Sequence, residues 1–312
     1  MNADNHFDVI ILGAGPAGLT AGIYLSRARV KTLIIDEGMA GGQLILTHQV
    51  ANYPGIENIS GFLLANNMRM QAEKFGCVLK QNVAVSDFSL EGKTKFVTLN
   101  SGETFTSNAL IITSGGRSRV LNVEGENDFK GRGISYCATC DGDFFTGKEI
   151  IVVGGGNSAL EEAVSLTKYA SKVTIVHQFS NFQAFPYAIK EAEENEKINF
   201  ILESKIKSFY GKEALEGVVI ENITTGETQN FPINGVFIFI GYVPNTEFLE
   251  GKIALNANKE IITDQNMATN VEGVFAAGDS VAKRFRQISI AVGEGTVAAL
   301  AASAFIHELK RN

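Results

Sequence analysis

The sequence predicts an α/β fold built from two units of similar construction, with the second inserted into the first. Residues 7–36 and 149–177 form an internal repeat, in which a β-branched run ends in glycines and continues through helix-forming sequence into a second β-branched run. Gly13 to Asp36 and Gly154 to His177 both span 23 positions. The length of 312 residues also suits two domains.

The composition favours a soluble globular protein and argues against two other classes. The chain has 27 Lys and Arg against 34 Asp and Glu, a formal charge of −7, whereas proteins that bind nucleic acid or anionic membranes are usually basic. No apolar run approaches the roughly 18 residues of a membrane span, so none is expected. Three cysteines in so long a chain cannot form a disulfide framework, which favours the cytoplasm.

The first copy of the repeat carries a complete G-x-G-x-x-G motif, and Asp36 closes its second strand. Gly13 permits the tight turn, Gly15 lets the backbone approach a pyrophosphate, and Gly18 lets the helix pack on the strand. The helix N-terminus then faces the phosphates, and the carboxylate accepts ribose hydroxyls. We therefore predict two Rossmann-like (three-layer ββα) nucleotide-binding domains, of which the first holds a dinucleotide.

The second copy keeps the phosphate-facing glycines but differs at the ribose end. His177 stands where Asp36 stands in the first copy, and residues 178–183 contain no arginine. An NAD site uses a carboxylate at this position, and an NADP site uses an arginine for the 2′-phosphate. The phosphate cradle is expected, whereas ordinary nicotinamide recognition is not. The candidate second nucleotide site comprises Gly154, Gly156, Asn157, Ser158, Ala159, His177, Phe179 and Phe182.

The remaining patterns predict how the chain passes between the two domains. Residues 104–120 predict strands and a turn with a first crossing near Gly115 to Val120, and residues 239–245 (FIGYVPN) predict the second crossing. EGVFAAGDS (272–280) predicts a short strand ending at Gly278, and residues 288–310 predict an amphipathic helix that packs on the first domain. The predicted boundaries are 1–116 with 246–312 for the first domain and 117–245 for the inserted one.

Cys137 and Cys140 form a CATC motif that predicts a redox-active pair. Two thiols three positions apart at a helix start can close a small disulfide and cycle between disulfide and dithiol. A zinc site needs a second pair of ligands, which the lone Cys77 and the scattered histidines do not supply, so no metal is expected. Structural thiols remain the alternative. Cys77 is expected to be a small buried apolar residue.

Seven motifs in order, GAGPAGLTA, GGQL, ANYPG, YCATCDG, VVGGGNSALEEA, GVFAAGD and RQI, resemble the low-molecular-weight thioredoxin reductases. The resemblance runs from about Phe7 to Ile306. It implies an FAD- and NADPH-dependent enzyme with two Rossmann-like domains, which forms a homodimer. The FAD residues that it implies are Gly13, Gly15, Pro16, Ala17, Gly18, Asp36, Glu37, Gly42, Gln43, Asn52, Gly278, Asp279, Arg286, Gln287 and Ile288.

The resemblance also implies roles for the residues around the redox pair. Cys140 is the cysteine that faces the flavin, Cys137 exchanges with the protein substrate, and Asp141 is the general acid–base. In the inserted domain the sequence departs from the family, because the H-R-R-x-x-x-R segment that binds NADPH is replaced by HQFSNFQ. Asn157 also replaces the usual aspartate. In these respects the chain is similar to divergent members that take electrons from ferredoxin or carry a second flavin.

Phe179, Phe182 and Phe185 have two interpretations. Their spacing of three places them near one face if the segment is helical, where they would pack in a core. Alternatively they form an aromatic surface for a flat ring, such as the isoalloxazine of a second FAD. Ferredoxin is acidic, so its docking needs a basic patch, for which Lys283, Arg284 and Arg286 are the candidates.

The predicted function is a flavin-dependent disulfide reductase of the thioredoxin reductase type. Electrons pass through FAD to the Cys137–Cys140 disulfide and on to a thioredoxin-like protein, and the donor is ferredoxin or a second flavin rather than NADPH. The alternatives are an ordinary NAD(P)H-dependent thioredoxin reductase and a non-enzymatic flavin and dithiol sensor. A weaker alternative is an NAD(P)H oxidase or a peroxide-linked flavoenzyme, because that chemistry does not require the CATC pair. Asp141 favours an enzyme, because proton transfer matters only with turnover.

Overall fold

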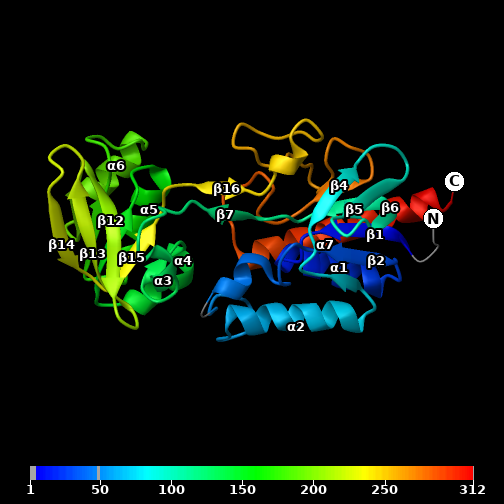
Figure 1. Cartoon of the computed structure of the whole chain (residues 1–312), viewed down its shortest axis with the longest axis horizontal. Helices are drawn as coiled ribbons and strands as arrows, with labels where there is room; N and C mark the ends of the chain where they lie inside the picture. Colours follow the sequence, from blue (N-terminus) through cyan, green and yellow to red (C-terminus); the bar gives the residue numbers. More distant parts are fainter. Residues whose placement is uncertain (1–4, 48–49, 312) are drawn as a thin grey trace. The chain divides into compact units, whose positions relative to one another are not determined.

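The computed structural model describes residues 5–47 and 50–311, which divide into two compact units (Figure 1). Unit 1 comprises residues 1–117 and 243–312, and unit 2 comprises residues 118–242. The predicted crossings at 116/117 and 245/246 therefore lie one and three residues from the observed ones. The chain crosses in two short strands, β7 (Gly116–Ser118) and β16 (Tyr242–Pro244), which contain the two boundaries and pair with each other.

Unit 1 is built on a seven-stranded sheet with the order β3-β2-β1-β6-β5-β4. Its β6 pairs antiparallel with β5 along its first half and parallel with β17 along its second half. The strands are β1 (His6–Leu12), β2 (Thr32–Ile35), β3 (Val78–Lys80), β4 (Val85–Ser89), β5 (Lys95–Leu99), β6 (Thr104–Ile112) and β17 (Val274–Ala276). The central strands are continuous apolar runs because both faces of the sheet are buried.

The helices of unit 1 are α1 (Pro16–Arg27), α2 (Gly61–Lys74) and α7 (Ile288–Leu309), with short 3₁₀ turns at η2 (Gly42–Leu46) and η4 (Glu247–Leu249). The predicted C-terminal helix is thus confirmed, and its small residues allow close packing on α1: a Cβ at Gly295 would meet the Ala17 carbonyl oxygen at 2.3 Å. Among the described helices, α7 alone has the length and mean hydropathy (1.6) of a membrane span. Its buried face packs in the core of unit 1.

Unit 2 repeats the construction with a parallel five-stranded sheet of order β11-β10-β9-β15-β8. Alternate residues of β9 point to opposite faces, Ile150 and Val152 toward the helices and Ile151 and Val153 toward a three-stranded antiparallel sheet, β12-β13-β14. This arrangement is the predicted three-layer ββα fold. The strands are β8 (Ile134–Ser135), β9 (Glu149–Val153), β10 (Lys172–Val176), β11 (Ile198–Ile201), β12 (Ser204–Gly211), β13 (Leu215–Asn222), β14 (Thr228–Pro232) and β15 (Gly235–Ile238).

The helices of unit 2 are α3 (Glu126–Phe129), α4 (Ala138–Asp141), α5 (Asn157–Leu166) and α6 (Pro186–Glu193), with a 3₁₀ turn, η3, at Gly142–Phe145. The repeat seen in the sequence corresponds to β1-α1-β2 in unit 1 and β9-α5-β10 in unit 2, each with parallel strands. In both units the glycine turn lies at the carboxyl end of the first strand and leads into a helix. This edge is where open α/β sheets bind ligands.

Candidate active site and nucleotide cradles

The glycine turn of unit 1 has the geometry that the motif predicts. Gly13 has φ +112°, and a Cβ on it would lie 2.3 Å from the Thr113 carbonyl oxygen. A Cβ on Gly18 would lie 2.0 Å from the Gly13 carbonyl oxygen, so both positions are closed to side chains. By contrast, no described atom lies within 4 Å of a Cβ built on Gly15. The backbone at Gly15 is therefore open to an approaching group.

Asp36 and the segment 41–43 lie beside this turn. The Asp36 carboxylate accepts hydrogen bonds from the Ala14 N–H (2.5 Å) and the Gly38 N–H (2.7 Å), which fixes the end of β2 against the turn. Two carboxylate oxygens have about four lone-pair sites, so capacity for ribose hydroxyls remains. The Gly41 N–H donates to the Ala14 carbonyl at 2.7 Å, and a Cβ on Gly42 would lie 3.3 Å from the Gly15 Cα.

The segment 278–280 reaches the same turn from β17. A Cβ on Gly278 would lie 2.9 Å from the Ala17 Cβ, and the Gly278 N–H donates to a Glu294 carboxylate oxygen on α7 at 2.8 Å. Burial raises the pKa of Asp279, an effect that Lys283 and Arg286 oppose. Sequence analysis missed the contact of Glu294 with Gly278, because a lone glutamate in an apolar helix has no motif.

The predicted basic patch for ferredoxin is wrong for two of its three members. Lys283, 11% exposed at its side chain, pairs with Glu294, and Arg286 pairs with the buried Glu260. Both cations therefore neutralise carboxylates within unit 1 and do not form an open docking surface. Sequence analysis could not identify these pairs, because their partners lie 11 and 26 positions away along the chain.

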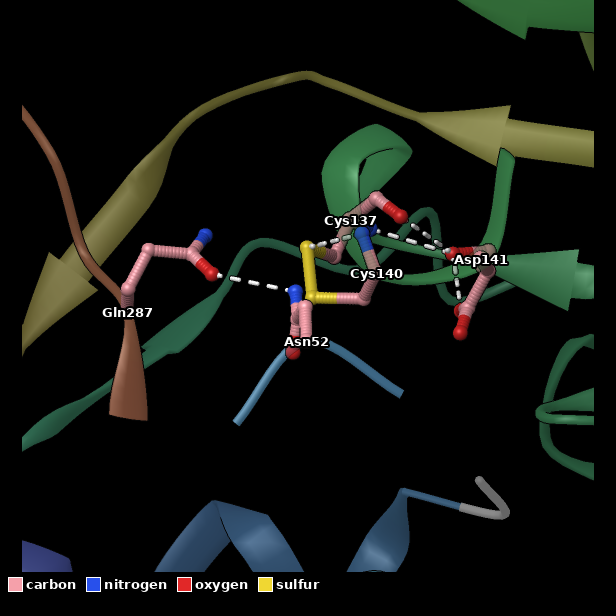
Figure 2. Close-up of a disulfide and its surroundings, with 6 residues drawn as sticks. Asn52, Cys137, Cys140, Asp141 and Gln287 are labelled. Atoms are coloured by element: carbon pink, nitrogen blue, oxygen red, sulfur yellow. Dashed lines mark hydrogen bonds between the residues drawn. A yellow bond between two sulfur atoms is a disulfide. The ribbon is translucent and has the colours of Figure 1, made fainter. Parts of the chain in front are cut away.

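Asn52 and Gln287 also meet within unit 1, although the sequence separates them by 235 positions. The Asn52 side-chain amide donates to the Gln287 side-chain oxygen at 3.4 Å (Figure 2). Gln287 is the residue that precedes α7, and Ile288 is the first residue of that helix. Glu37, next to Asp36, is exposed. The structure thus brings together the predicted residues from four separate segments of unit 1.

The residues of unit 1 fit the FAD that the sequence implies. The space beside Gly15 can take a pyrophosphate, and the α1 N-terminus that faces it has no side-chain cap among the described residues. The Oγ atoms of Ser114 and Ser280 are buried and find no hydrogen-bond partner among the described residues. Buried hydroxyls usually have partners, and the polar groups of a bound FAD would be available to such atoms.

The redox pair lies in unit 2 as a closed disulfide between Cys137 and Cys140, with their Cα atoms 5.3 Å apart (Figure 2). Cys137 immediately precedes the single-turn helix α4, and its sulfur accepts a hydrogen bond from the Cys140 N–H at 3.2 Å. Both cysteines are half-buried. The predicted proximity of the two thiols is confirmed, and residues 137–141 are called the redox turn below.

Asp141 ends the redox turn, and its carboxylate accepts a hydrogen bond from the Ser135 hydroxyl at 2.6 Å. Tyr136, the residue before Cys137, donates its hydroxyl hydrogen to Glu126 at 2.7 Å. Glu126 is buried and also accepts from the N–H groups of Leu121 and Asn122. Burial and the adjacent carboxylate of Glu126 raise the pKa of Tyr136, so this phenol stays neutral. The redox turn is therefore anchored on both sides of Cys137.

The second glycine turn resembles the first in its backbone. Gly154 has φ +141°, and a Cβ on it would lie 2.4 Å from the Phe239 carbonyl oxygen and 2.9 Å from the Ala159 Cβ. For a Cβ built on Gly156, the nearest described atom is the Gln183 carbonyl oxygen, at 4.0 Å. Ser158 is exposed in the first turn of α5. The second glycine turn thus repeats the positive φ and the closed first position of the turn in unit 1.

Residues 178–185, called the strap below, fold back on this second turn. The Gln183 N–H donates to the Gly155 carbonyl at 2.8 Å, and the Phe185 N–H donates to the Asn157 side-chain oxygen at 2.7 Å. The Asn157 oxygen is therefore occupied by the strap. The strap is not helical, since α6 begins only at Pro186, so the condition under which the three phenylalanines would share one face is not met.

His177 follows β10 as Asp36 follows β2, but its ring packs inward against the second glycine turn. It is 5% exposed, its ring stacks on Phe182, and a Cβ on Gly155 would lie 2.3 Å from it. Burial lowers the pKa of His177, an effect that hydrogen bonds to Asn181 and Gln183 partly oppose, so the ring is neutral near pH 7. Phe182 packs against the core, whereas Phe179 (50%) and Phe185 (69%) are exposed.

Comparison with known proteins places this geometry in a family. The family model described as pyridine nucleotide-disulphide oxidoreductase matches residues 7–295. Thioredoxin reductase of Peptoclostridium acidaminophilum is 42% identical over 310 residues, covering 97% of this chain and 98% of that protein. Thioredoxin reductase of Bacillus subtilis (strain 168) is 42% identical over 313 residues, covering 99% and 98%. The chain belongs to the pyridine nucleotide-disulphide oxidoreductases.

A solved structure agrees with this membership. Thioredoxin reductase from Streptococcus pyogenes superposes with a TM-score of 0.94 at 37% identity, covering 98% of this chain and 100% of that one. The protein is therefore a flavin-dependent disulfide oxidoreductase of the thioredoxin reductase type. The resemblance seen in the sequence is confirmed at the level of the family, and the alternative of a non-enzymatic sensor is not supported.

Cys77, the third cysteine of this oxidoreductase, is buried and free, as predicted. Burial raises the pKa of its thiol to about 12, so only about one molecule in ten thousand is a thiolate at pH 8. We expect the folded, reduced protein to react with two equivalents of a thiol reagent at pH 8 and the unfolded protein with three. Iodoacetamide labelling followed by mass spectrometry measures this, and rapid native labelling of Cys77 would contradict it.

Proposed function

We propose that this oxidoreductase reduces the disulfide of a thioredoxin-like protein with electrons from a donor other than NADPH. The observation that carries the proposal is the ribose end of the second cradle. Residues 177–183 contain no lysine or arginine, and the histidine in this segment is buried against Gly155. The second cradle can therefore hold phosphates but offers no cation from this segment to a 2′-phosphate.

The comparison between the two units strengthens this interpretation. In unit 1 the residue at the end of the second strand, Asp36, hydrogen-bonds to the Ala14 N–H of the glycine turn. In unit 2 the equivalent positions are His177 and Gly155, and the imidazole fills the space that the missing Cβ leaves. The neutral His177 ring cannot replace a carboxylate that accepts two ribose hydroxyls.

The chemistry at the redox turn follows from Cys137, Cys140 and Asp141. The dithiol reacts after the proton of Cys137 has moved to Asp141. The Cys137 thiolate attacks one sulfur of the target disulfide, a mixed disulfide forms, and the departing target sulfur takes the proton from Asp141. The Cys140 thiol then passes its proton through Asp141 to the second departing sulfur, while its own sulfur attacks Cys137 and closes the enzyme disulfide. Two electrons and two protons reach the target.

The residues that would hold FAD are those gathered in unit 1 around Gly13, Gly15 and Gly18. When bound, FAD supplies the two electrons that reopen the Cys137–Cys140 disulfide. Asp36 would hold ribose hydroxyls, and the backbone beside Gly15 would hold the pyrophosphate. The resemblance assigns Cys140 to the flavin side and Cys137 to the protein side, and this assignment remains part of the proposal.

Two donors fit the proposal, reduced ferredoxin and a second flavin bound at the exposed Phe179 of unit 2. The ordinary alternative is an NAD(P)H-dependent thioredoxin reductase, which is the family's usual chemistry. Counting the nucleotides released by denaturation separates a second flavin from ferredoxin, because only the former gives two FAD per chain. Homodimer formation, cytoplasmic location and the identity of unit 2 as an NAD(P)H-like domain remain predictions.

The donor is tested by anaerobic stopped-flow mixing of the oxidised holoenzyme with NADPH, NADH and reduced ferredoxin. We expect flavin bleaching by either nicotinamide to be at least about 100-fold slower than bleaching by ferredoxin, because both lack an anchor in unit 2. If the second flavin is the entry point, the protein contains two FAD and dithionite reduces both. Rapid bleaching at micromolar NADPH would return the protein to the ordinary class.

A gain-of-function variant provides the matched control. Gln178 and Phe179 are both exposed, so arginine side chains at these positions can extend into solvent. We expect Gln178→Arg with Phe179→Arg to speed flavin reduction by NADPH about 10-fold, through charge-assisted hydrogen bonds to the 2′-phosphate. Glutamates at the same two positions should give no gain. Equal gains with NADPH and NADH would show that the phosphate is not the group recognised.

A further inference from the structure

Ser135 links the parallel sheet of unit 2 to both Cys137 and Asp141 of the redox turn. It is the last residue of β8, where its backbone pairs with the fully buried Phe237 of β15. Its hydroxyl oxygen accepts the Cys137 N–H at 3.1 Å and lies 2.6 Å from the Asp141 Oδ2. The Cys137 carbonyl oxygen is a further neighbour at 3.3 Å. One buried hydroxyl therefore contacts the backbone of the attacking cysteine and the carboxylate.

A hydroxyl has a single proton, so its direction depends on which acceptor is stronger. An ionised carboxylate at 2.6 Å attracts the proton more strongly than a carbonyl at 3.3 Å. When Asp141 is protonated, its own O–H can donate to the Ser135 oxygen, and the serine proton can turn to the Cys137 carbonyl. The same atoms thus hold Asp141 in both protonation states that the catalytic cycle requires.

The need for such a contact follows from the shortness of α4. This helix has four residues, too few to fix its last side chain by helical packing alone. In the oxidised enzyme the Cys137–Cys140 disulfide also constrains the turn, but that constraint is lost when the disulfide opens. The hydrogen bonds of Ser135 do not involve sulfur, so opening the disulfide removes none of their partner atoms.

We propose that Ser135 is a positioning residue that holds the Asp141 carboxyl beside Cys137 and so delivers the proton to the departing sulfur of the target. This inference rests on the acid–base role proposed above for Asp141. It predicts that losing the hydroxyl harms only reactions in which the departing sulfur needs a proton. A departing thiolate of low pKa leaves readily without one.

The test uses the holoenzyme, reduced anaerobically with dithionite, against two small disulfides. Bis(2-hydroxyethyl) disulfide has an alkyl leaving group that needs protonation, whereas 5,5′-dithiobis(2-nitrobenzoic acid) has an aromatic one that does not. We expect Ser135→Ala to slow the first reaction about 10-fold and to leave the second within about twofold of the parent. Ser135→Thr, which restores a hydroxyl, should recover most of the rate with the alkyl disulfide.

Two further variants separate positioning from damage to the fold. Ser204→Ala removes another buried serine hydroxyl of unit 2, one that donates to the Leu202 carbonyl, and should leave both rates unchanged. In an Asp141→Asn background, Ser135→Ala should add no further loss, because both variants remove the same proton delivery.

Equal slowing with both disulfides, or multiplied losses in the double variant, would overturn the inference and assign Ser135 a structural role. The single variant Asp141→Asn tests the acid–base role of Asp141 independently. If that variant reduces the alkyl disulfide at the parent rate, the proposed role of Asp141 fails, and the inference for Ser135 fails with it.

Discussion

Replacement of Cys140 by serine is expected to abolish disulfide reduction while leaving the flavin bound. Either cysteine variant should lower turnover by a factor on the order of 10³ or more, since neither can form the enzyme disulfide. The two variants should differ in colour. If the proposed assignment of Cys140 to the flavin side holds, the remaining Cys140 thiolate in Cys137→Ser should give a long-wavelength thiolate-to-flavin absorption. Absorption spectra between pH 6 and 9 measure it.

Cys77→Ala is the matched control for this pair of variants, because it removes the third thiol without touching the redox turn. It should keep the parent spectrum and most of the turnover. A long-wavelength band in Cys140→Ser instead of Cys137→Ser would reverse the two assigned roles. Identical spectra for both variants would remove the basis for assigning one cysteine to each side.

The second large effect is expected for Gly15→Glu, which should purify folded but without FAD. No described atom lies within 4 Å of a Cβ at this position, and its φ of −71° is open to any residue, so the polypeptide tolerates the side chain. The space it enters is where the pyrophosphate binds, and its charge repels phosphate. We expect FAD affinity to fall about 100-fold or more. Flavin fluorescence after denaturation, together with circular dichroism, measures both quantities.

Gly156→Glu is a matched control, because Gly156 precedes α5 as Gly15 precedes α1 and has a similar backbone (φ −91°). If each chain binds a single FAD in unit 1, the Gly156→Glu variant should keep its full FAD content. If unit 2 holds a second flavin, the variant loses half of the total. A folded Gly15→Glu protein that retains FAD would exclude the first cradle as its site.

Much of the fold and of the first cradle could be predicted because each depends on local sequence. The central strands are apolar throughout, and Gly13 and Gly18 are required where a Cβ would meet backbone atoms. Asp36 was recognisable because its spacing from the glycine turn is set by one strand and one helix. The pairing of Cys137 with Cys140 follows from a separation of three residues.

The second cradle shows where spacing alone misleads. His177 has the same separation from its glycines as Asp36, yet its ring turns into the core because Gly155 leaves room where unit 1 has Ala14. The strap depends on hydrogen bonds to Gly155 and Asn157 that no local pattern encodes. Ser135 was equally invisible, since a serine two residues before a cysteine is not a motif. Its role depends on a strand of only two residues.

The insertion of unit 2 into unit 1 determines the order in which the nascent chain can complete its parts. The half of β6 that pairs with β17, and the face of α1 that packs on α7, are synthesised before residue 118. Their partners emerge from the ribosome only after all of unit 2 has been made. Unit 2 is contiguous and can fold first, whereas the early part of unit 1 must wait with apolar surface uncovered. Interrupted synthesis should therefore leave a folded inserted unit on an incomplete host, a species prone to aggregation.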